Sequence, residues 1–124
     1  MTIYVALEDA IAIHADQIAT YGGSPGLRDE GLLLSALLRP QTGYYGDLIE
    51  EAAALWESLS MNHAFIDGNK RTGFVAAELF LRLNGYQLTA DDADCVLTML
   101  AVAAGDVTED EFADWLRRHS VPRV

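Results

Sequence analysis

Residues 63–73 contain the side chains of this sequence that are best suited to chemistry. Six residues of complementary types fall within nine positions, and they are His63, Asp67, Gly68, Asn69, Lys70 and Arg71. Lys70 is the only lysine in a chain with 8 lysines and arginines and 19 acidic residues. A neutral imidazole can accept a proton from a hydroxyl group near pH 7, which makes His63 a candidate general base. The stretch is therefore a candidate active site.

The second half of this stretch is suited to binding phosphate. A nearly continuous apolar run predicts a helix that begins at Asn69 or Lys70 and ends near Asn84. The free N–H groups at the helix start, together with Lys70 and Arg71, would form an anion site. Asp67 is a candidate ligand for Mg²⁺, which proteins bind through one or two carboxylates and the phosphates of a substrate. Asn69 can bind either a loop carbonyl or a phosphate oxygen.

Simpler interpretations account for these residues less well. Gly68 and Gly73 have the spacing of the two P-loop glycines, but Phe74 and Val75 stand where that motif needs Lys and Ser or Thr. The three histidines are not spaced as zinc ligands. A plain helix-loop-helix corner, with Asn69 as a cap and a solvated pair of charges, explains any one residue but not the combination.

Composition and charge limit the classes of protein to which the chain can belong. Its 124 residues, 51% hydrophobic content and lack of low-complexity segments predict one globular domain over residues 1–124. The net charge of -11 disfavours direct binding to nucleic acid or to an anionic membrane surface. A single cysteine, Cys95, and the absence of a signal peptide or a membrane-spanning apolar run favour a soluble protein of the reducing cytoplasm.

Hydrophobic spacing and capping signals predict an all-α domain, a single bundle of about six helices. The helices are expected at residues 7–21, 29–39, 47–62, 69–84, 89–104 and 108–119. The expected capping residues are Asp29, Asp47, Thr89 and Thr108. The helix at 69–84 is apolar nearly all round and should be the central, most buried one, while the helix at 29–39 has almost no polar face. Cys95 is expected to be a small buried hydrophobe.

Several residues near the candidate site have both a structural and a functional interpretation. His14 lies on the apolar face of the first helix, so it is expected to be a core histidine with a backbone partner rather than a site residue. Phe65 is expected to be a buried anchor under the motif loop. The loop at residues 41–46 carries Tyr44 and Tyr45 between glycines. These rings can simply pack, or they can form a flap that presents aromatic surface to a partner chain.

The order of residues from His63 to Arg71, His-x-Phe-x-Asp-Gly-Asn-Lys-Arg, resembles the signature of the Fic/Doc superfamily. Other stretches resemble the Doc branch, the death-on-curing toxins, and they are Tyr21-Gly22-Gly23, Gly26-Leu27-Arg28-Asp29, Arg39-Pro40 and Leu81-Arg82-Leu83-Asn84-Gly85. The resemblance covers nearly the whole chain. It implies the all-helical Fic/Doc fold around a central buried helix, and a toxin of a type II toxin–antitoxin system with a cognate antitoxin as partner.

The resemblance also implies an activity, the transfer of a group from ATP to a hydroxyl group of a target protein. His63 would be the base and Asp67 the Mg²⁺ ligand. The phosphates of ATP would be bound by Gly68, Asn69, Lys70 and Arg71. The loop with Tyr44 and Tyr45 stands in the place of the family's target-docking flap.

Two departures from the Fic adenylyltransferases bear on which group is transferred. Lys70 stands where those enzymes typically have a small glycine, and Phe74 where they have an arginine. Both changes alter the phosphate site, and Doc-like protein kinases share them. The resemblance therefore implies transfer of the γ-phosphate of ATP to a Ser or Thr hydroxyl of a translation factor, elongation factor Tu, which would halt translation. Adenylylation, or a catalytically silent subunit that only binds an antitoxin, is the alternative.

Overall fold

The computed structural model describes residues 1–123, and α-helices dominate this part of the chain. The elements are α1 (Leu7–Tyr21), α2 (Glu30–Leu38), the 3-10 helix η1 (Arg39–Gln41), α3 (Leu48–Met61), α4 (Asn69–Leu83), β1 (Tyr86–Leu88), α5 (Asp92–Ala104), α6 (Glu109–Arg118) and β2 (Ser120–Pro122). The predicted all-α architecture is confirmed. The sequence did not predict the antiparallel pair of β1 and β2, because strands of three residues carry too little pattern. None of the helices in these residues is long and apolar enough to cross a membrane.

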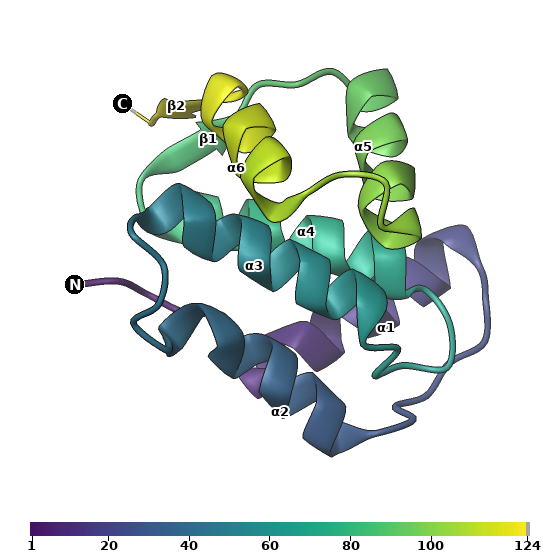
Figure 1. Cartoon of the computed structure of the whole chain (residues 1–124). Coiled ribbons are helices and arrows are strands. Elements are labelled where there is room, and N and C mark those ends of the chain that lie inside the picture. The colour runs from purple at the N-terminus through teal and green to yellow at the C-terminus, as the bar shows by residue number, and fades with distance from the viewer. Residues whose placement is uncertain (124) are drawn as a thin grey trace.

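Helices α3 and α4 form the centre of the molecule. They pack against each other; α2, α5 and α6 also contact α3, while α1, α5 and β1 contact α4. Figure 1 shows α3 between α6 and α2, with α4 behind it. Nine residues of α3 are buried and seven of α4, so the prediction that α4 is the most buried helix is wrong. The reason is that one side of α4 is only partly covered: Phe74, Val75 and Glu78 are half-buried there and Arg82 is exposed.

Two peripheral helices expose more apolar surface than the sequence predicted. In α2, Leu33, Ala36 and Leu37 are buried. In α5, only Cys95 and Val102 are buried, which confirms the prediction for the cysteine. The apolar side chains left exposed on these two helices are Leu34, Leu38, Val96, Leu97 and Leu100. Each helix packs with one face only, so a continuous apolar run does not ensure burial on every side.

Capping residues start the helices as predicted, with one exception. The confirmed caps are Asp29, Asp47 and Thr108, each of which accepts a hydrogen bond from a backbone N–H three residues later. The start of α5 is capped instead by Asp91, whose Oδ1 accepts from Asp94 N at 2.8 Å, so the prediction of Thr89 as cap is wrong. Thr89 follows β1, and its hydroxyl group donates to His119 O at 2.9 Å.

The two central helices approach each other closely at Gly73 of α4. A Cβ atom at Gly73 would lie 2.6 Å from Ser60 Oγ and 2.9 Å from the backbone oxygen of Trp56. That backbone cannot yield easily, because the Trp56 ring is packed against Phe74 and Phe112 in the core. Gly73 therefore permits the short distance between α3 and α4, and with it the position of the loop that connects them.

We expect Gly73→Ala to destabilise the protein, although alanine favours a helix more than glycine does. The added methyl group would overlap Ser60 and the main chain of Trp56, and overpacking of this kind costs about 1–3 kcal/mol of unfolding free energy. Urea denaturation followed by circular dichroism measures the change. The control is Gly46→Ala, whose new Cβ would meet only the flexible end of Glu50, at 3.0 Å. Equal or higher stability of Gly73→Ala would contradict the close approach.

Candidate active site

The loop at residues 62–68 connects α3 to α4, and His63 lies at its start. The φ angle of His63 is 53°, and no other non-glycine residue in the described part of the chain has a positive φ. A left-handed backbone costs roughly 1–2 kcal/mol for a residue with a Cβ atom, so neighbouring contacts must hold it. One such contact is a hydrogen bond from Arg28 Nε to His63 O at 2.7 Å. The imidazole is exposed, as a group that accepts a proton from a substrate must be.

Asn69, the first residue of α4, fixes the middle of this loop. Its side-chain Oδ1 accepts a hydrogen bond from Phe65 N at 3.1 Å, and its Nδ2 donates to Phe65 O at 3.0 Å. Phe65 is only 2% exposed, which confirms its prediction as a buried anchor. The side chain of Asn69 therefore binds a loop carbonyl, the first of its two expected roles.

His14 of α1 supports the same loop from the interior. Its ring is 4% exposed and stacks on the ring of Phe65 with 3.8 Å between the centroids. The backbone carbonyl oxygen of Asp67 can only accept a hydrogen bond, so the Nε2–H group of His14 donates to it at 2.7 Å. His14 is thus a core histidine with a backbone partner, as predicted, and the partner belongs to the candidate site.

The carboxylate of Asp67 is exposed and is held by two backbone N–H groups. Its Oδ2 accepts from Ser24 N at 3.1 Å, and its Oδ1 accepts from Gly68 N at 2.8 Å. The hydrogen bond from Ser24, followed by that from Gly68, lowers the pKa of the Asp67 carboxyl group, so it is ionised at neutral pH. Gly23 makes this approach possible, since a Cβ atom there would lie 2.7 Å from Asp67 Oδ2.

This carboxylate fits the expected Mg²⁺ ligand. Each of its oxygens keeps a lone pair after accepting its backbone hydrogen bond. Over residues 1–123 there is no group of three or more His, Cys, Asp or Glu side chains that could enclose a metal ion. Mg²⁺ commonly binds through one carboxylate together with the phosphates of a substrate, so it does not require such a group. The role of Asp67 as a metal ligand stays a prediction.

The first turn of α4 has the properties expected of an anion site. The backbone N–H groups of Asn69, Lys70 and Arg71 have no acceptor among the described residues. The side chain of Lys70 is exposed. Arg71 is half-buried, because its Nη2 donates to Gly22 O at 2.9 Å and its guanidinium lies over the ring of Tyr21. Binding of a phosphate here also stays a prediction.

A cavity of about 410 Å³ brings the expected residues together. Its lining consists of Ser60, His63, Ile66, Asp67, Gly68, Asn69, Lys70, Arg71, Met99 and Leu100. All six residues that the sequence singled out are among them. A proton acceptor, an ionised carboxylate and a helix start with two cations therefore face one space, an arrangement suited to the transfer of a phosphate-containing group.

The loop expected to form a flap lies beside a different cavity. Tyr44 is 81% exposed and Tyr45 is half-buried, and neither lines the cavity that contains His63. The second cavity, of about 480 Å³, is lined in part by Thr42 of this loop and by Asn62, which precedes His63. The start of the loop therefore shares a cavity with Asn62, but neither tyrosine lines the cavity that contains His63. Docking of a target at Tyr44 and Tyr45 stays a prediction.

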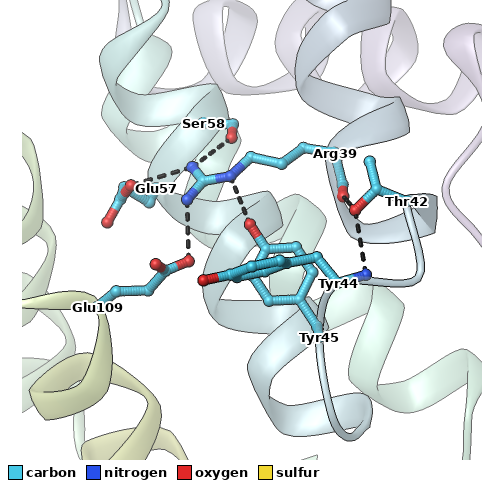
Figure 2. A network of polar contacts seen from close by, with 7 residues as sticks. All are labelled: Arg39, Thr42, Tyr44, Tyr45, Glu57, Ser58 and Glu109. Carbon is cyan, nitrogen blue, oxygen red and sulfur yellow. Dashed lines mark hydrogen bonds and ion pairs between the residues drawn. The ribbon is translucent and has the colours of Figure 1, made fainter.

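One arginine holds this loop to two helices (Figure 2). Arg39 Nε donates to the hydroxyl oxygen of Tyr45 at 2.8 Å. Its Nη1 donates to Glu57 of α3 at 3.0 Å, and its Nη2 donates to Glu109 of α6 at 2.9 Å. The structural roles of Arg39 and Arg28 were not predicted from the sequence. The available signals were that arginine is scarce in so acidic a chain and that both arginines lie in stretches that resemble the Doc branch.

Known proteins resemble this chain over almost its whole length. The sequence model of the Fic/DOC family matches residues 4–81. The chain is 45% identical over 120 residues to the protein named Toxin Doc from Mycolicibacterium smegmatis (strain ATCC 700084 / mc(2)155), which covers 91% of this chain and 90% of that protein. It is 34% identical over 119 residues to the protein named Protein kinase doc from Escherichia phage P1, which covers 93% of this chain and 94% of that protein. The chain therefore belongs to the Fic/DOC family.

Proposed function

We propose that this chain is a Doc-type toxin that transfers the γ-phosphate of ATP to a Ser or Thr hydroxyl group of a translation factor, elongation factor Tu, in the cytoplasm. The observation that carries the proposal is the common cavity. It is lined by the exposed imidazole of His63, the carboxylate of Asp67, and the cations Lys70 and Arg71 at the start of α4.

His63 would begin the transfer as the general base. Its imidazole takes the proton of the acceptor hydroxyl group, and the hydroxyl oxygen forms a bond to the γ-phosphorus. The bond from that phosphorus to the oxygen shared with the β-phosphate breaks, and ADP leaves with the electron pair. Little else is required of a side chain in phosphoryl transfer beyond positioning and charge stabilisation.

The residues at the start of α4 would position the phosphates. Lys70, Arg71 and the free N–H groups of the first turn neutralise and orient phosphate oxygens. Gly68, with its left-handed φ of 74°, forms the turn that leads into this helix. Asn69 contributes its backbone N–H while its side chain holds the loop. Asp67 would hold Mg²⁺, which supplies further positive charge to the phosphates when it is bound.

Two positions support γ-phosphate transfer over adenylylation. Lys70 adds a point charge inside the cavity, where a glycine would leave room for a phosphate against the backbone. Phe74 packs its ring against Trp56 at 5.2 Å, so this position serves the aromatic core and provides no cation. One of the relatives is named a protein kinase. Adenylylation is the alternative reaction.

The name Toxin Doc of the other relative supports a toxin with a cognate antitoxin as its partner. A catalytically silent subunit that only binds the antitoxin is a further alternative. The intact set of His63, Asp67, Lys70 and Arg71 argues against it, because binding alone gives no reason for a base, a carboxylate and two cations to share a cavity.

The position of the transferred label distinguishes these alternatives. Incubated with elongation factor Tu and Mg²⁺, the protein should transfer label from ATP labelled at the γ-phosphate and none from ATP labelled at the α-phosphate. Chelation of Mg²⁺ should reduce transfer to background. Label from the α-phosphate would refute the kinase reaction and favour adenylylation. No transfer from either nucleotide, even to proteins of a cell extract, would favour the silent subunit.

Replacement of His63 tests the base separately. We expect His63→Asn to lower the rate of transfer by about 10²- to 10⁴-fold, the contribution typical of a general base. Asparagine tolerates a left-handed backbone better than other residues with a Cβ atom, so stability should change little. His119→Asn is the control, since His119 lies at the end of α6 and its ring contacts Trp115 O. Wild-type rates in His63→Asn, or continued toxicity in cells, would exclude His63 as the base.

A further inference from the structure

Arg28 lies beside the candidate base in a way that the proposed reaction does not use. The segment that precedes α2 runs alongside the loop between α3 and α4. Leu27 and Phe65 form an antiparallel β-bridge, and Arg28 N donates to Ala64 O at 2.8 Å. Backbone bonds alone thus fasten the two segments together, and they bring the side chain of Arg28 next to His63.

The side chain of Arg28 adds a contact that this pairing does not require. Its Nε donates to His63 O at 2.7 Å, across 35 positions of sequence. Within residues 1–123, the Arg28 side chain makes no other hydrogen bond. No carboxylate of these residues lies within ion-pair distance of its guanidinium group. Nineteen acidic residues are present in the chain, yet this guanidinium is directed to the carbonyl group of the candidate base.

The backbone of His63 is the one most in need of such a contact. It is left-handed, a conformation that a residue with a Cβ atom leaves readily unless its surroundings prevent it. The carbonyl carbon and Cβ of His63 are bonded to the same Cα atom. Rotation about the N–Cα bond, which changes φ, would therefore move the carbonyl group and the imidazole together. A donor that holds the carbonyl oxygen against this rotation therefore also holds the Cβ atom from which the imidazole extends.

We propose that Arg28 is a positioning residue, which holds His63 in its left-handed conformation so that the imidazole is directed at the acceptor hydroxyl group. The proposal rests on the role of His63 as the base. Arg28 acts through the hydrogen-bond donor at Nε and not through its charge, and it contacts neither ATP nor the target protein.

Two uncharged substitutions separate the donor from the charge. In Arg28→Gln, the amide nitrogen stands as many bonds from Cα as Nε does in arginine, so a donor remains; Arg28→Met removes the donor as well. With elongation factor Tu as acceptor, we expect Arg28→Met to lower kcat by about 10- to 100-fold, as misplacement of a catalytic group does, with the KM for ATP unchanged. Arg28→Gln should keep most of the kcat. A raised KM for ATP, or equal losses in both variants, would overturn the proposal.

A double-variant cycle tests whether Arg28 acts through His63. If it does, Arg28→Met should cause no further loss of kcat in a protein that already carries His63→Asn. A further loss as large as that of Arg28→Met alone would show an independent role and refute the proposal. If His63→Asn itself leaves kcat unchanged, the proposed function fails. If His63→Asn lowers kcat and Arg28→Met does not, only the present inference fails.

A control and a second readout guard against a purely structural effect. Arg118→Met is the matched control, because Arg118 also uses Nε to donate to a backbone oxygen, Asp114 O at 3.3 Å, on an exposed face of α6. It should leave kcat unchanged. Without any turnover, the NMR signals of the His63 imidazole should broaden or shift in Arg28→Met and match the wild type in Arg28→Gln. Unchanged imidazole signals in Arg28→Met would overturn the proposal.

Discussion

Hydrogen bonds to the main chain of residues 63–67 are the constraint on which the rest of the site depends. Four of the five carbonyl oxygens in this loop accept a hydrogen bond from a residue elsewhere in the chain. The side-chain donors come from three different elements: His14 from α1, Asn69 from α4, and Arg28 from the segment before α2. A loop held from three sides keeps one conformation. For the proposed role of His63 as the base, such rigidity would matter, because displacement of a catalytic group by about 1 Å can cost about 100-fold in rate.

The constraint on the loop also bears on how a strongly acidic chain would form the proposed anion site. Within residues 1–123, the arginines that pair with carboxylates are Arg39, Arg82 and Arg117, and all three lie away from the candidate site. Arg117 binds Asp47 at 2.7 Å, and Arg39 binds two glutamates. Arg71 uses one nitrogen on a backbone oxygen, whereas Lys70 extends into the cavity. The fixed loop leads directly into α4, so the positive charges of Lys70 and Arg71 lie beside the free N–H groups at the start of that helix. Local charge there can attract an anion despite the net charge of -11.

Local signals in the sequence were sufficient for the helices, and tertiary contacts decided the rest. Thr108 caps its helix as predicted, because a cap involves atoms only three residues apart. Thr89 has the same spacing pattern but lies two residues before the cap of α5, where Asp91 accepts the capping hydrogen bond instead. The site residues could be predicted from the sequence, because histidines and cations are scarce in this chain and several of them cluster in residues 63–71. The left-handed backbone of His63 and its contact with Arg28 were not readable, since they depend on two distant segments being brought together by the fold.

The residues of the candidate site serve two different needs, and this division explains why the stretch is so informative. His63, Asp67 and Lys70 present exposed ionisable groups to the cavity. Asn69 and Gly68 serve the backbone, one by binding both polar groups of a loop residue and the other by adopting a left-handed turn before α4. The proposed chemistry alone would not require the backbone contacts of Asn69 and Gly68. Folding alone would not require the ionisable side chains in the cavity. Because both needs are met within nine positions, few unrelated sequences would satisfy them by chance. The whole stretch therefore supports a stronger functional inference than any one of its residues.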